Sequence, residues 1–308
     1  MNILKKQLIK CYQVLNPAIR IEKRLNQQLF FERRMQIDNN LLSLHEKGVT
    51  DEKYCDAQII VSLTTYGRRI HSVYLTIESL MEQTMKANRI ILWLDESFRD
   101  KKLPKSLEML CDRGLEIAFC KDVRSYKKLV PALCKFPNDV IITADDDLLY
   151  DANMLENLIL PYLENPHYIY TNRAHKILLD QDKGLKSYND WEYESRCVEA
   201  SKFVFPTGGG GVLYPPHSLD DEVLNEEVFM DICPFADDVW FKAMSLKKGT
   251  LVKRVETISP NGCEYLENPS VQDIGLFNTN AGNVNMNDVQ LKKVFSKYNL
   301  YSLLEDVD

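Results

Sequence analysis

A chain of 308 residues is long enough for two domains or one large α/β domain, because domains average about 150 residues. Hydrophobic residues make up 45% and charged residues 27%, which is typical of a globular protein and excludes a disordered, collagen-like or coiled-coil chain. The net charge of −7 combines an excess of six positive charges over residues 1–36 with an acidic remainder. The acidic remainder excludes nucleic acid as a general partner, and an anionic ligand would need a local positive charge such as a metal ion.

Residues 1–50 are predicted to form a basic helical arm. Apolar side chains recur there at helical spacing on both sides of a break at Pro17, namely Leu4, Leu8, Tyr12 and Leu15, then Ile21, Leu25 and Leu29. The arm fits two hypotheses, a helix on an anionic membrane surface and a solvated arm that packs on the domain or on a second subunit. Lys10 and Pro17 interrupt any apolar stretch of a secretory signal, and no apolar stretch is long enough to span a bilayer. The sequence therefore predicts a cytoplasmic protein, with contact between the arm and the inner face of the cell membrane left open, and it leaves the oligomeric state undetermined.

From residue 51 onward the chain is predicted to be α/β. Four apolar stretches of strand length alternate with amphipathic helical stretches, and the strands are expected at Ile59–Thr64, Ile90–Leu94, Leu115–Phe119 and Val140–Thr143. This alternation is typical of βαβ units in a mostly parallel sheet flanked by helices. Such sheets bind ligands at the carboxyl ends of their strands, so the residues just after each strand are the candidates for chemistry.

The second half, residues 151–308, is predicted to be α+β and to be built onto the first half. Tyr168–Thr171 and Val212–Tyr214 are expected to be strands and Asp237–Leu246 a helix, whereas the tail from Pro260 is rich in Asn and Gly. No linker separates the halves, so residues 51–308 are predicted to form one domain.

Three adjacent carboxylates, those of Asp145, Asp146 and Asp147, follow the fourth predicted strand. Adjacent negative charges are unfavourable unless a positive charge lies among them. Alternate residues of an extended segment face the same side, so Asp145 and Asp147 are candidates to bind one divalent cation, and carboxylate oxygens favour Mg²⁺ or Mn²⁺. The structural alternative is a solvated turn.

An ordered set of sequence blocks resembles the nucleotide-sugar glycosyltransferases of the GT-A fold, and more narrowly the family-2-like, D-x-D-containing transferases of bacterial polysaccharide clusters. The blocks are Val61–Ile70, Ile77–Thr84, Arg89–Leu94, Ser125–Leu133, Thr143–Asp147, Thr207–Pro216 and Asp237–Phe241. The resemblance implies a Rossmann-like GT-A fold in which residues 51–150 bind a nucleotide-sugar and residues 151–308 bind the acceptor. It implies a metal-dependent, inverting transfer of a sugar from a UDP-sugar to a glycan or lipid-linked saccharide in surface polysaccharide biosynthesis, with Mn²⁺ or Mg²⁺ as cofactor.

The resemblance also implies a set of donor-binding residues. Asp147, together with Asp145, is expected to hold the metal, and Asp145 is expected to lie near the donor ribose. The other donor-binding residues that it implies are Thr64, Thr65, Tyr66, Arg69, Asp95, Lys128 and Asp146. Arg69 and Lys128 are the candidate phosphate partners, since arginine offers planar bidentate donors and lysine a point charge. Asp95 is expected to accept a hydrogen bond from a uracil N–H, with helix capping as its structural alternative.

The acceptor-binding and catalytic residues are implied in the second half. Asp238 is the expected base that deprotonates the acceptor hydroxyl, with Asp237 beside it at the start of a helix. The acceptor pocket is implied to include Trp191, Thr207, Gly208, Gly209 and Gly210. Glycines allow a close approach of the backbone to a ligand, and the rings of Trp191, Tyr188 and Tyr193 suit the apolar face of a sugar. The structural alternatives are a glycine bulge and an aromatic core.

Other functions compete with this interpretation. A sugar-phosphate nucleotidylyltransferase has a similar sheet but is expected to carry a Gly-rich basic loop after its first strand, where residues 64–69 hold one glycine. A phosphatase of the haloacid-dehalogenase type needs its D-x-D after the first strand, whereas here it follows the fourth. A non-catalytic carbohydrate-binding relative would have lost Asp147 or Asp238, and both are present.

Overall fold

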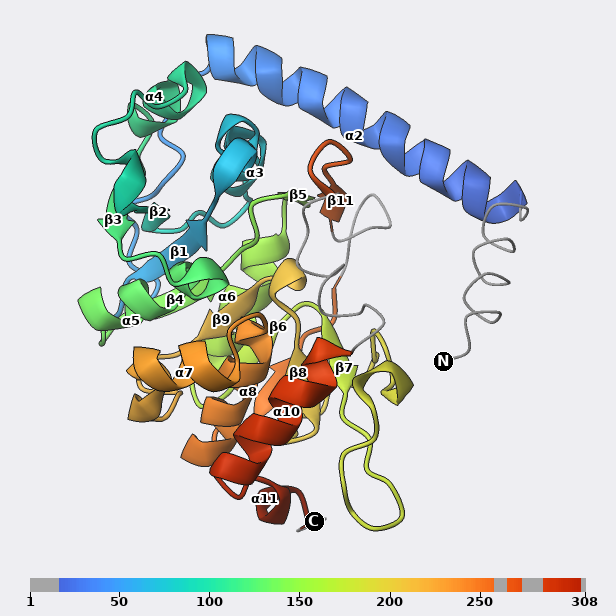
Figure 1. Ribbon diagram of the computed structural model, residues 1–308. Coiled ribbons are helices and arrows are strands. Elements are labelled where there is room, and N and C mark those ends of the chain that lie inside the picture. Colours follow the sequence, from blue (N-terminus) through green and yellow to red (C-terminus); the bar gives the residue numbers. More distant parts are fainter. Residues whose placement is uncertain (1–16, 258–264, 273–284, 306–308) are drawn as a thin grey trace.

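The computed structural model describes residues 17–257, 265–272 and 285–305. Its centre is a seven-stranded sheet with the strand order β10-β6-β9-β4-β1-β2-β3 (Figure 1). The bounds of these strands are β1 (Ile59–Thr64), β2 (Arg89–Asp95), β3 (Leu115–Cys120), β4 (Val140–Thr143), β6 (Ile169–Thr171), β9 (Val212–Tyr214) and β10 (Val252–Arg254). Neighbouring strands are parallel except where β9 pairs with β4 and with β6. The predicted α/β fold, with a mostly parallel central sheet flanked by helices, is thus confirmed.

The first four strands lie within one residue of their predicted bounds, and helices connect them as expected. These helices are α3 (Val73–Met81), α4 (Lys105–Cys111) and α5 (Val130–Lys135), with the 3₁₀ helices η1 (Gly67–His71), η2 (Glu96–Phe98) and η3 (Arg124–Lys128) beside them. β1 is buried on both faces: Ile59, Val61 and Leu63 enter one apolar cluster and Ile60 enters the other. A strand covered on both sides is apolar at successive positions, which is why these four were visible in the sequence.

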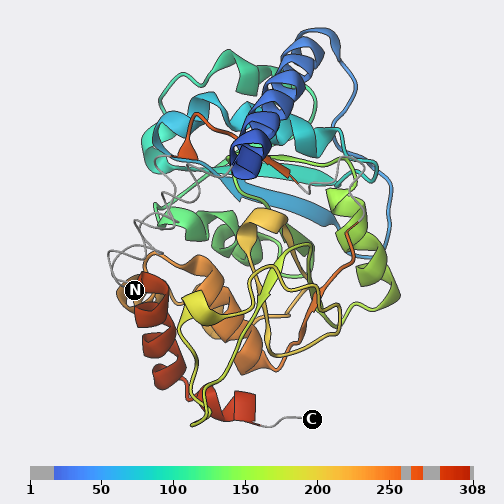
Figure 2. The ribbon, with the colours of Figure 1, turned by 90° about the vertical axis from the view of Figure 1, so that its right-hand side faces the viewer.

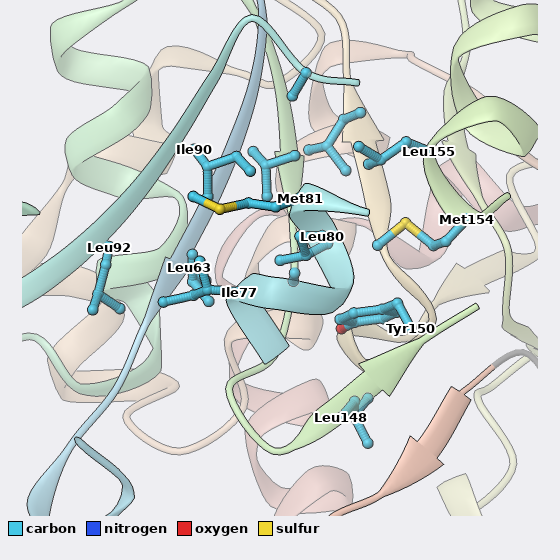
Figure 3. Close-up of a cluster of buried hydrophobic side chains, with 14 of the residues drawn as sticks. Leu63, Ile77, Leu80, Met81, Ile90, Leu92, Leu148, Tyr150, Met154 and Leu155 are labelled. Carbon is cyan, nitrogen blue, oxygen red and sulfur yellow. The ribbon is translucent and has the colours of Figure 1, made fainter. Parts of the chain in front are cut away.

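Two apolar cores lie on opposite faces of the sheet. Figure 3 shows part of the first, to which the sheet contributes Leu63 and Ile90, α3 contributes Ile77 and Leu80, and the segment after β4 contributes Tyr150. Its helical cover also includes α6 (Met154–Glu164). The second core contains side chains from α7 (Glu226–Ile232), α8 (Asp237–Lys248), α10 (Met286–Lys297) and α11 (Tyr301–Glu305). The sheet between these two layers of helices gives the residues at its edge a rigid support.

The second half adds short elements around the main sheet. Two-stranded sheets pair β5 (Leu148–Tyr150) with β11 (Tyr265–Glu267) and β7 (Ala174–Lys176) with β8 (Val204–Pro206). The 3₁₀ helices η4 (Tyr188–Asp190), η5 (Gly208–Gly210) and η6 (Asp221–Leu224) complete it. The predicted strands at 168–171 and 212–214 and the helix from Asp237 are present, whereas α10 and α11 in the tail were not predicted. Residues 258–264 and 273–284 of that Asn- and Gly-rich tail lie outside the described residues.

The arm contains one long helix, α2 (Pro17–Ser43), which lies across the outside of the molecule next to α3 and β11 (Figures 1 and 2). Phe30, Ile37 and Leu41 bury its inner face. Ile21 and Leu25, which were predicted to lie on the apolar stripe, are 65% and 52% exposed. Spacing alone does not show which side of a helix meets the domain, and these two side chains lie away from it. Residues 4–15 of the predicted stripe lie outside the described residues.

Polar contacts fix α2 on the domain. Arg33 forms an ion pair with Glu82, and the Tyr74 hydroxyl donates a hydrogen bond to Asp38 at 2.6 Å. The C-terminal part of α2 therefore packs on the domain of its own chain. None of the helices in the described part of the chain has the length and apolar character needed to cross a bilayer.

Candidate functional site

A cavity of about 920 Å³ lies at the carboxyl ends of β1 and β4. Residues that follow these two strands form one side, and the loop before β9 and the start of α8 form another. Because β9 runs antiparallel to β4, the loop before β9 arrives at the same edge of the sheet as the residues that follow β4. The cavity thus occupies the place where ligands bind in open α/β sheets.

Thr64, Thr65 and Tyr66 line the cavity after β1, as their predicted position requires. The protein already uses both hydroxyls of the threonines: Thr64 donates to the carbonyl of Trp93 at 2.8 Å, and Thr65 donates to Oδ2 of Asp146 at 2.5 Å. The Tyr66 ring is 41% exposed, and the Arg69 guanidinium lies 5.3 Å from its centre. The threonines therefore hold the loop in shape, and the tyrosine presents a ring to the cavity.

Asp146 is turned inward and anchors Arg69. Nη1 of Arg69 donates to Oδ1 of Asp146 at 2.6 Å, and both side chains are only 7% exposed. Burial raises the pKa of Asp146, while Arg69 and Thr65 act in the opposite direction by stabilising the carboxylate. Both oxygens of Asp146 are thus occupied, which points to support of Arg69 rather than to the predicted contact with a donor.

Asp145 and Asp147 remain on the cavity side of the triplet. Oδ2 of Asp147 lies 3.1 Å from Nη2 of Arg69 and accepts a hydrogen bond from Gln272 at 3.2 Å. Burial, followed by the repulsion of Asp145, raises the pKa of Asp147 to about 6. A carboxylate in this position is stabilised by an additional positive charge.

We tested whether these residues fit a divalent cation. Among the described residues no group of three or more His, Cys, Asp and Glu side chains is arranged to hold a metal ion. Asp145 and Asp147 nevertheless supply hard oxygen donors, and the raised pKa of Asp147 shows that its charge is incompletely compensated. Mg²⁺ is commonly bound through one or two carboxylates, several waters and substrate phosphates. The residues therefore fit a cation that arrives with a phosphate-bearing ligand.

Lys128 joins the triplet to the aspartates of α8. Its Nζ lies 2.9 Å from Asp145, 3.0 Å from Asp237 and 3.9 Å from Asp238. Burial alone would lower the pKa of Lys128, but the three carboxylates outweigh it and hold this pKa well above its ordinary value. Lys128 was predicted to bind phosphate, but here its charge is taken up by carboxylates of the protein. Its position instead ties the two acidic segments together.

The two aspartates at the start of α8 differ in their access to the cavity. Asp237 is 6% exposed and accepts a hydrogen bond from the Ser125 hydroxyl at 2.9 Å. The Asp238 side chain is 32% exposed, and its Oδ2 accepts the backbone N–H of Gly208 at 3.1 Å. Burial raises the pKa of Asp238 to about 7, with a further upward contribution from Asp237. Of the two predicted catalytic residues, the geometry therefore favours Asp238 as the group that can reach a ligand.

The glycine loop packs directly on these charges. A Cβ on Gly208 would lie 2.5 Å from Nζ of Lys128 and 3.2 Å from Oδ1 of Asp238. A Cβ on Gly209 would meet Leu148 at an ordinary contact distance of 3.4 Å. Thr207, Gly208 and Gly209 line the cavity, whereas Gly210 packs behind the loop against Arg173. Of the two glycines that line the cavity, Gly208 is therefore the one at which a side chain would press on the charged groups.

Besides Gly210, two more predicted binding residues lie outside the cavity lining. Asp95 accepts the N–H of Ser97 at 2.9 Å and caps η2. Trp191 is 4% exposed, and its Nε1 donates to the carbonyl of Lys186 at 3.0 Å. Both residues follow their structural alternatives, because a capping aspartate and a core tryptophan satisfy their polar atoms within the protein.

Sequence analysis did not single out Arg173 and His175, which line the cavity with Tyr188 and Tyr193. Nδ1 of His175 accepts the N–H of Glu194 at 3.0 Å, so the ring carries its proton on Nε2. Burial, followed by the charge of Arg173, lowers the pKa of His175 to about 4. Only their position in the sequence, after the predicted strand at 168–171, could have indicated Arg173 and His175 as candidate site residues.

No protein-family model and no curated protein matches this chain. Among solved structures, the chain is similar to CMP:2-keto-3-deoxy-manno-octonic acid synthetase complexed with CTP, at 11% identity and a TM-score of 0.40, over 71% of this chain and 96% of that one. It is also similar to the inositol-1-phosphate CTP transferase from T. maritima, at 13% identity and a TM-score of 0.39, over 80% of this chain and 96% of that one. With such low scores, the activities of these proteins are not transferred to this chain.

The comparison corrects the predicted resemblance. Neither of the two structures is named as a glycosyltransferase, so the comparisons contradict the assignment to GT-A glycosyltransferases and the sugar-transfer function drawn from it. The blocks behind the resemblance explain the error. They comprise buried strands, a glycine loop and carboxylates at a sheet edge, features that suit binding of a nucleotide phosphate in general. They do not specify which bond is broken.

Proposed function

We propose that the protein is a metal-dependent nucleotidylyltransferase, which joins the nucleoside monophosphate part of a nucleoside triphosphate to an oxygen of a second substrate. One observation carries the proposal: the Asp145 and Asp147 carboxylates and the Asp238 carboxylate line the same cavity, and Lys128 holds the two acidic segments together. The first pair suits a cation that accompanies phosphates, and the last suits a base.

Each residue has a defined part in this reaction. A divalent cation held by Asp145 and Asp147 would neutralise charge on the triphosphate. Arg69, fixed by Asp146, offers donors for a phosphate oxygen, and Tyr66 presents its ring beside them. The loop after β1 has one glycine, so in this proposal the phosphates are held by charge rather than by the backbone of a Gly-rich loop.

The proposed reaction exchanges one P–O bond for another and transfers one proton. An oxygen of the second substrate attacks the α-phosphorus, a new P–O bond forms, and the bond to the β-phosphate breaks to release pyrophosphate. The proton of the attacking hydroxyl passes to a carboxylate oxygen of Asp238. Burial raises the pKa of Asp238 above its ordinary value, which makes its carboxylate a stronger base toward this proton.

The test begins with nucleotide binding. CTP, UTP, ATP and GTP are titrated calorimetrically with and without Mg²⁺ into the wild type, Asp147→Asn and, as a matched control, Asp112→Asn, an exposed aspartate at the end of α4. We expect one nucleotide to bind in a Mg²⁺-dependent manner, with a loss of at least about tenfold in Asp147→Asn and no change in the control.

Turnover is then measured with the nucleotide that binds. Release of pyrophosphate on addition of a second substrate supports the proposal. Failure of all four nucleotides to bind, or release of nucleoside diphosphate in place of pyrophosphate, contradicts it.

A further inference from the structure

We propose that the cavity wall formed by Arg173, His175, Tyr188 and Tyr193 binds the second substrate, and that this substrate is a cyclic polyol of monosaccharide size that carries a phosphate or carboxylate. The inference rests on the proposed function, because it assigns the partner of the nucleotide in that reaction. The wall takes its residues from the segment after β6 and from the η4 region, and it shares the cavity with Asp238.

The aromatic part of the wall is held rigidly. The backbone N–H of Tyr188 donates to Asp288 at 2.6 Å, and the Tyr188 ring packs at 4.9 Å from the ring of Trp191. The Tyr193 ring packs against the His175 ring, with 4.3 Å between the ring centres, and Tyr193 remains 42% exposed. A rigid, partly exposed ring offers a flat apolar surface at little entropic cost, which suits the C–H face of a cyclic polyol.

Polar groups of the wall suit the hydroxyls of such a ring. Among the described residues no hydrogen-bond partner reaches the Tyr188 hydroxyl, although this side chain lines the cavity. Burial and the charge of Asp238 raise the pKa of Tyr188, so the phenol keeps its proton and can donate. His175 is neutral in this setting, so the aromatic part of the wall carries no charge of its own.

Arg173 supplies the charge that selects an anionic ligand. Its Nη1 donates to Oγ1 of Thr207 at 3.0 Å, whereas Nε and Nη2 both point at a single oxygen of Glu194, at 3.1 and 2.9 Å. These two donors form the fork of the guanidinium that phosphate and carboxylate groups bind in a bidentate manner. The site therefore already holds an anionic group at the position proposed for that of the substrate.

The ion pair between Glu194 and Arg173 has features that favour its replacement by a ligand. Its side chain in the ion pair is 66% exposed, and its backbone has φ of 49°, in the left-handed region that non-glycine residues seldom occupy. Exposed ion pairs are weak, and strained backbone is concentrated at ligand-binding sites. We infer that a ligand anion displaces the Glu194 carboxylate from Arg173.

The experiment separates the ring from the charge. Binding is measured by calorimetry in EDTA, without nucleotide, so that no cation can bridge a phosphate to Asp147. The probes are glucose 1-phosphate, mannose 1-phosphate, glucuronic acid, glucose and inorganic phosphate. The first three distinguish phosphate from carboxylate as the anionic group, and the last two supply the ring or the charge alone.

Variants of the wall are chosen so that some should weaken binding of the probe and one should tighten it. We expect Arg173→Met to weaken binding of the best probe by at least tenfold and Tyr193→Leu to weaken it by threefold to tenfold. Glu194→Gln, which removes the competing charge, is expected to tighten it by threefold or more. The exposed residues Arg196 and Glu199 provide matched controls as Arg196→Met and Glu199→Gln, and both are expected to leave binding unchanged. A variant that merely misfolds cannot give the gain expected of Glu194→Gln.

The remaining outcomes overturn the inference. If glucose binds as tightly as its phosphate and Arg173→Met has no effect, the wall does not select an anion. If inorganic phosphate binds as tightly as the sugar phosphates and Tyr193→Leu has no effect, the wall does not bind a ring. If none of the three anionic rings binds, the inference fails, and the Mg²⁺-dependent nucleotide titration shows separately whether the proposed function fails with it.

Discussion

Lys242 offers the sharpest test of how burial and charge determine the stability of this protein. It lies in the middle of α8 and is 1% exposed, and among the described residues no hydrogen-bond partner reaches its Nζ. Burial lowers the pKa of Lys242 from its usual 10.5 to about 7. This side chain does not line the cavity, so its replacement tests stability separately from binding.

The expected effect of Lys242→Met follows from that shift. Below pH 7 the unfolded chain and the folded protein both carry the proton, and the folded state bears the full cost of the buried charge. The cost disappears as pH rises toward 10.5, where the unfolded lysine also becomes neutral. At about 1.4 kcal/mol per pKa unit, the variant should be more stable than the wild type by about 4 kcal/mol at pH 7 and by about 1 kcal/mol at pH 9.5.

Urea unfolding followed by far-UV circular dichroism at pH 7 and pH 9.5 measures this difference. Methionine keeps the length and apolar stem of lysine and removes its charge. Lys248→Met, at an exposed position of the same helix, is the matched control and is expected to change stability by less than about 0.5 kcal/mol. A destabilised Lys242→Met, or a stability gain that does not shrink at pH 9.5, would show that the buried ammonium is stabilised by the protein and would refute the reasoning.

Two further predictions concern the cavity. Gly208→Ala should weaken Mg²⁺-dependent nucleotide binding, because its Cβ would lie 2.5 Å from Nζ of Lys128 and would push this ammonium away from the carboxylates that it joins. Gly209→Ala, with its nearest contact at 3.4 Å, should bind within about twofold of the wild type in the same calorimetric titration. His175, with its pKa lowered from 6.5 to about 4, should make the folded state lose about 3 kcal/mol of stability as pH falls from 6.5 to 4, because the unfolded chain then binds a proton that the folded protein does not. His175→Asn should remove that part of the pH dependence in urea unfolding, and equal pH slopes for variant and wild type would contradict it.

The sheet could be predicted from sequence because its strands are covered on both faces. Residues such as Ile59, Ile60 and Val61 are all buried, and no surface strand would be apolar at three successive positions. The position of the site followed from the same pattern, since Asp145, Asp147 and Asp238 do line one cavity at the sheet edge. The local sequence pattern thus indicated which residues line the cavity.

What the sequence did not reveal depends on contacts between distant segments. Lys128 contacts Asp145 and Asp237 only after the sheet and α8 have packed together, and the spacing of these residues along the sequence does not indicate the contact. Asp95 follows a strand just as Asp145 does, but a neighbouring backbone N–H takes up its carboxylate. The sugar-transfer prediction was wrong for a related reason, since residues suited to binding phosphate at a sheet edge can serve several reactions.

The antiparallel strand β9 has a consequence for how the chain acquires its site. It inserts between β4 and β6, so the edge of β4 that would otherwise be open is closed by a segment about 70 residues further along the chain. β1 pairs with β2 and β2 with β3 through short connections, and these pairs are expected to assemble early in folding. β4 pairs with β1, and β9 with β4, only after loops of roughly 70 to 80 residues have closed. A fragment that ends near residue 150 would keep the aspartate triplet but present β4 as an unprotected edge, which favours aggregation. The two halves are therefore expected to fold as one unit, because the cavity needs residues from both sides of the β4–β9 pairing.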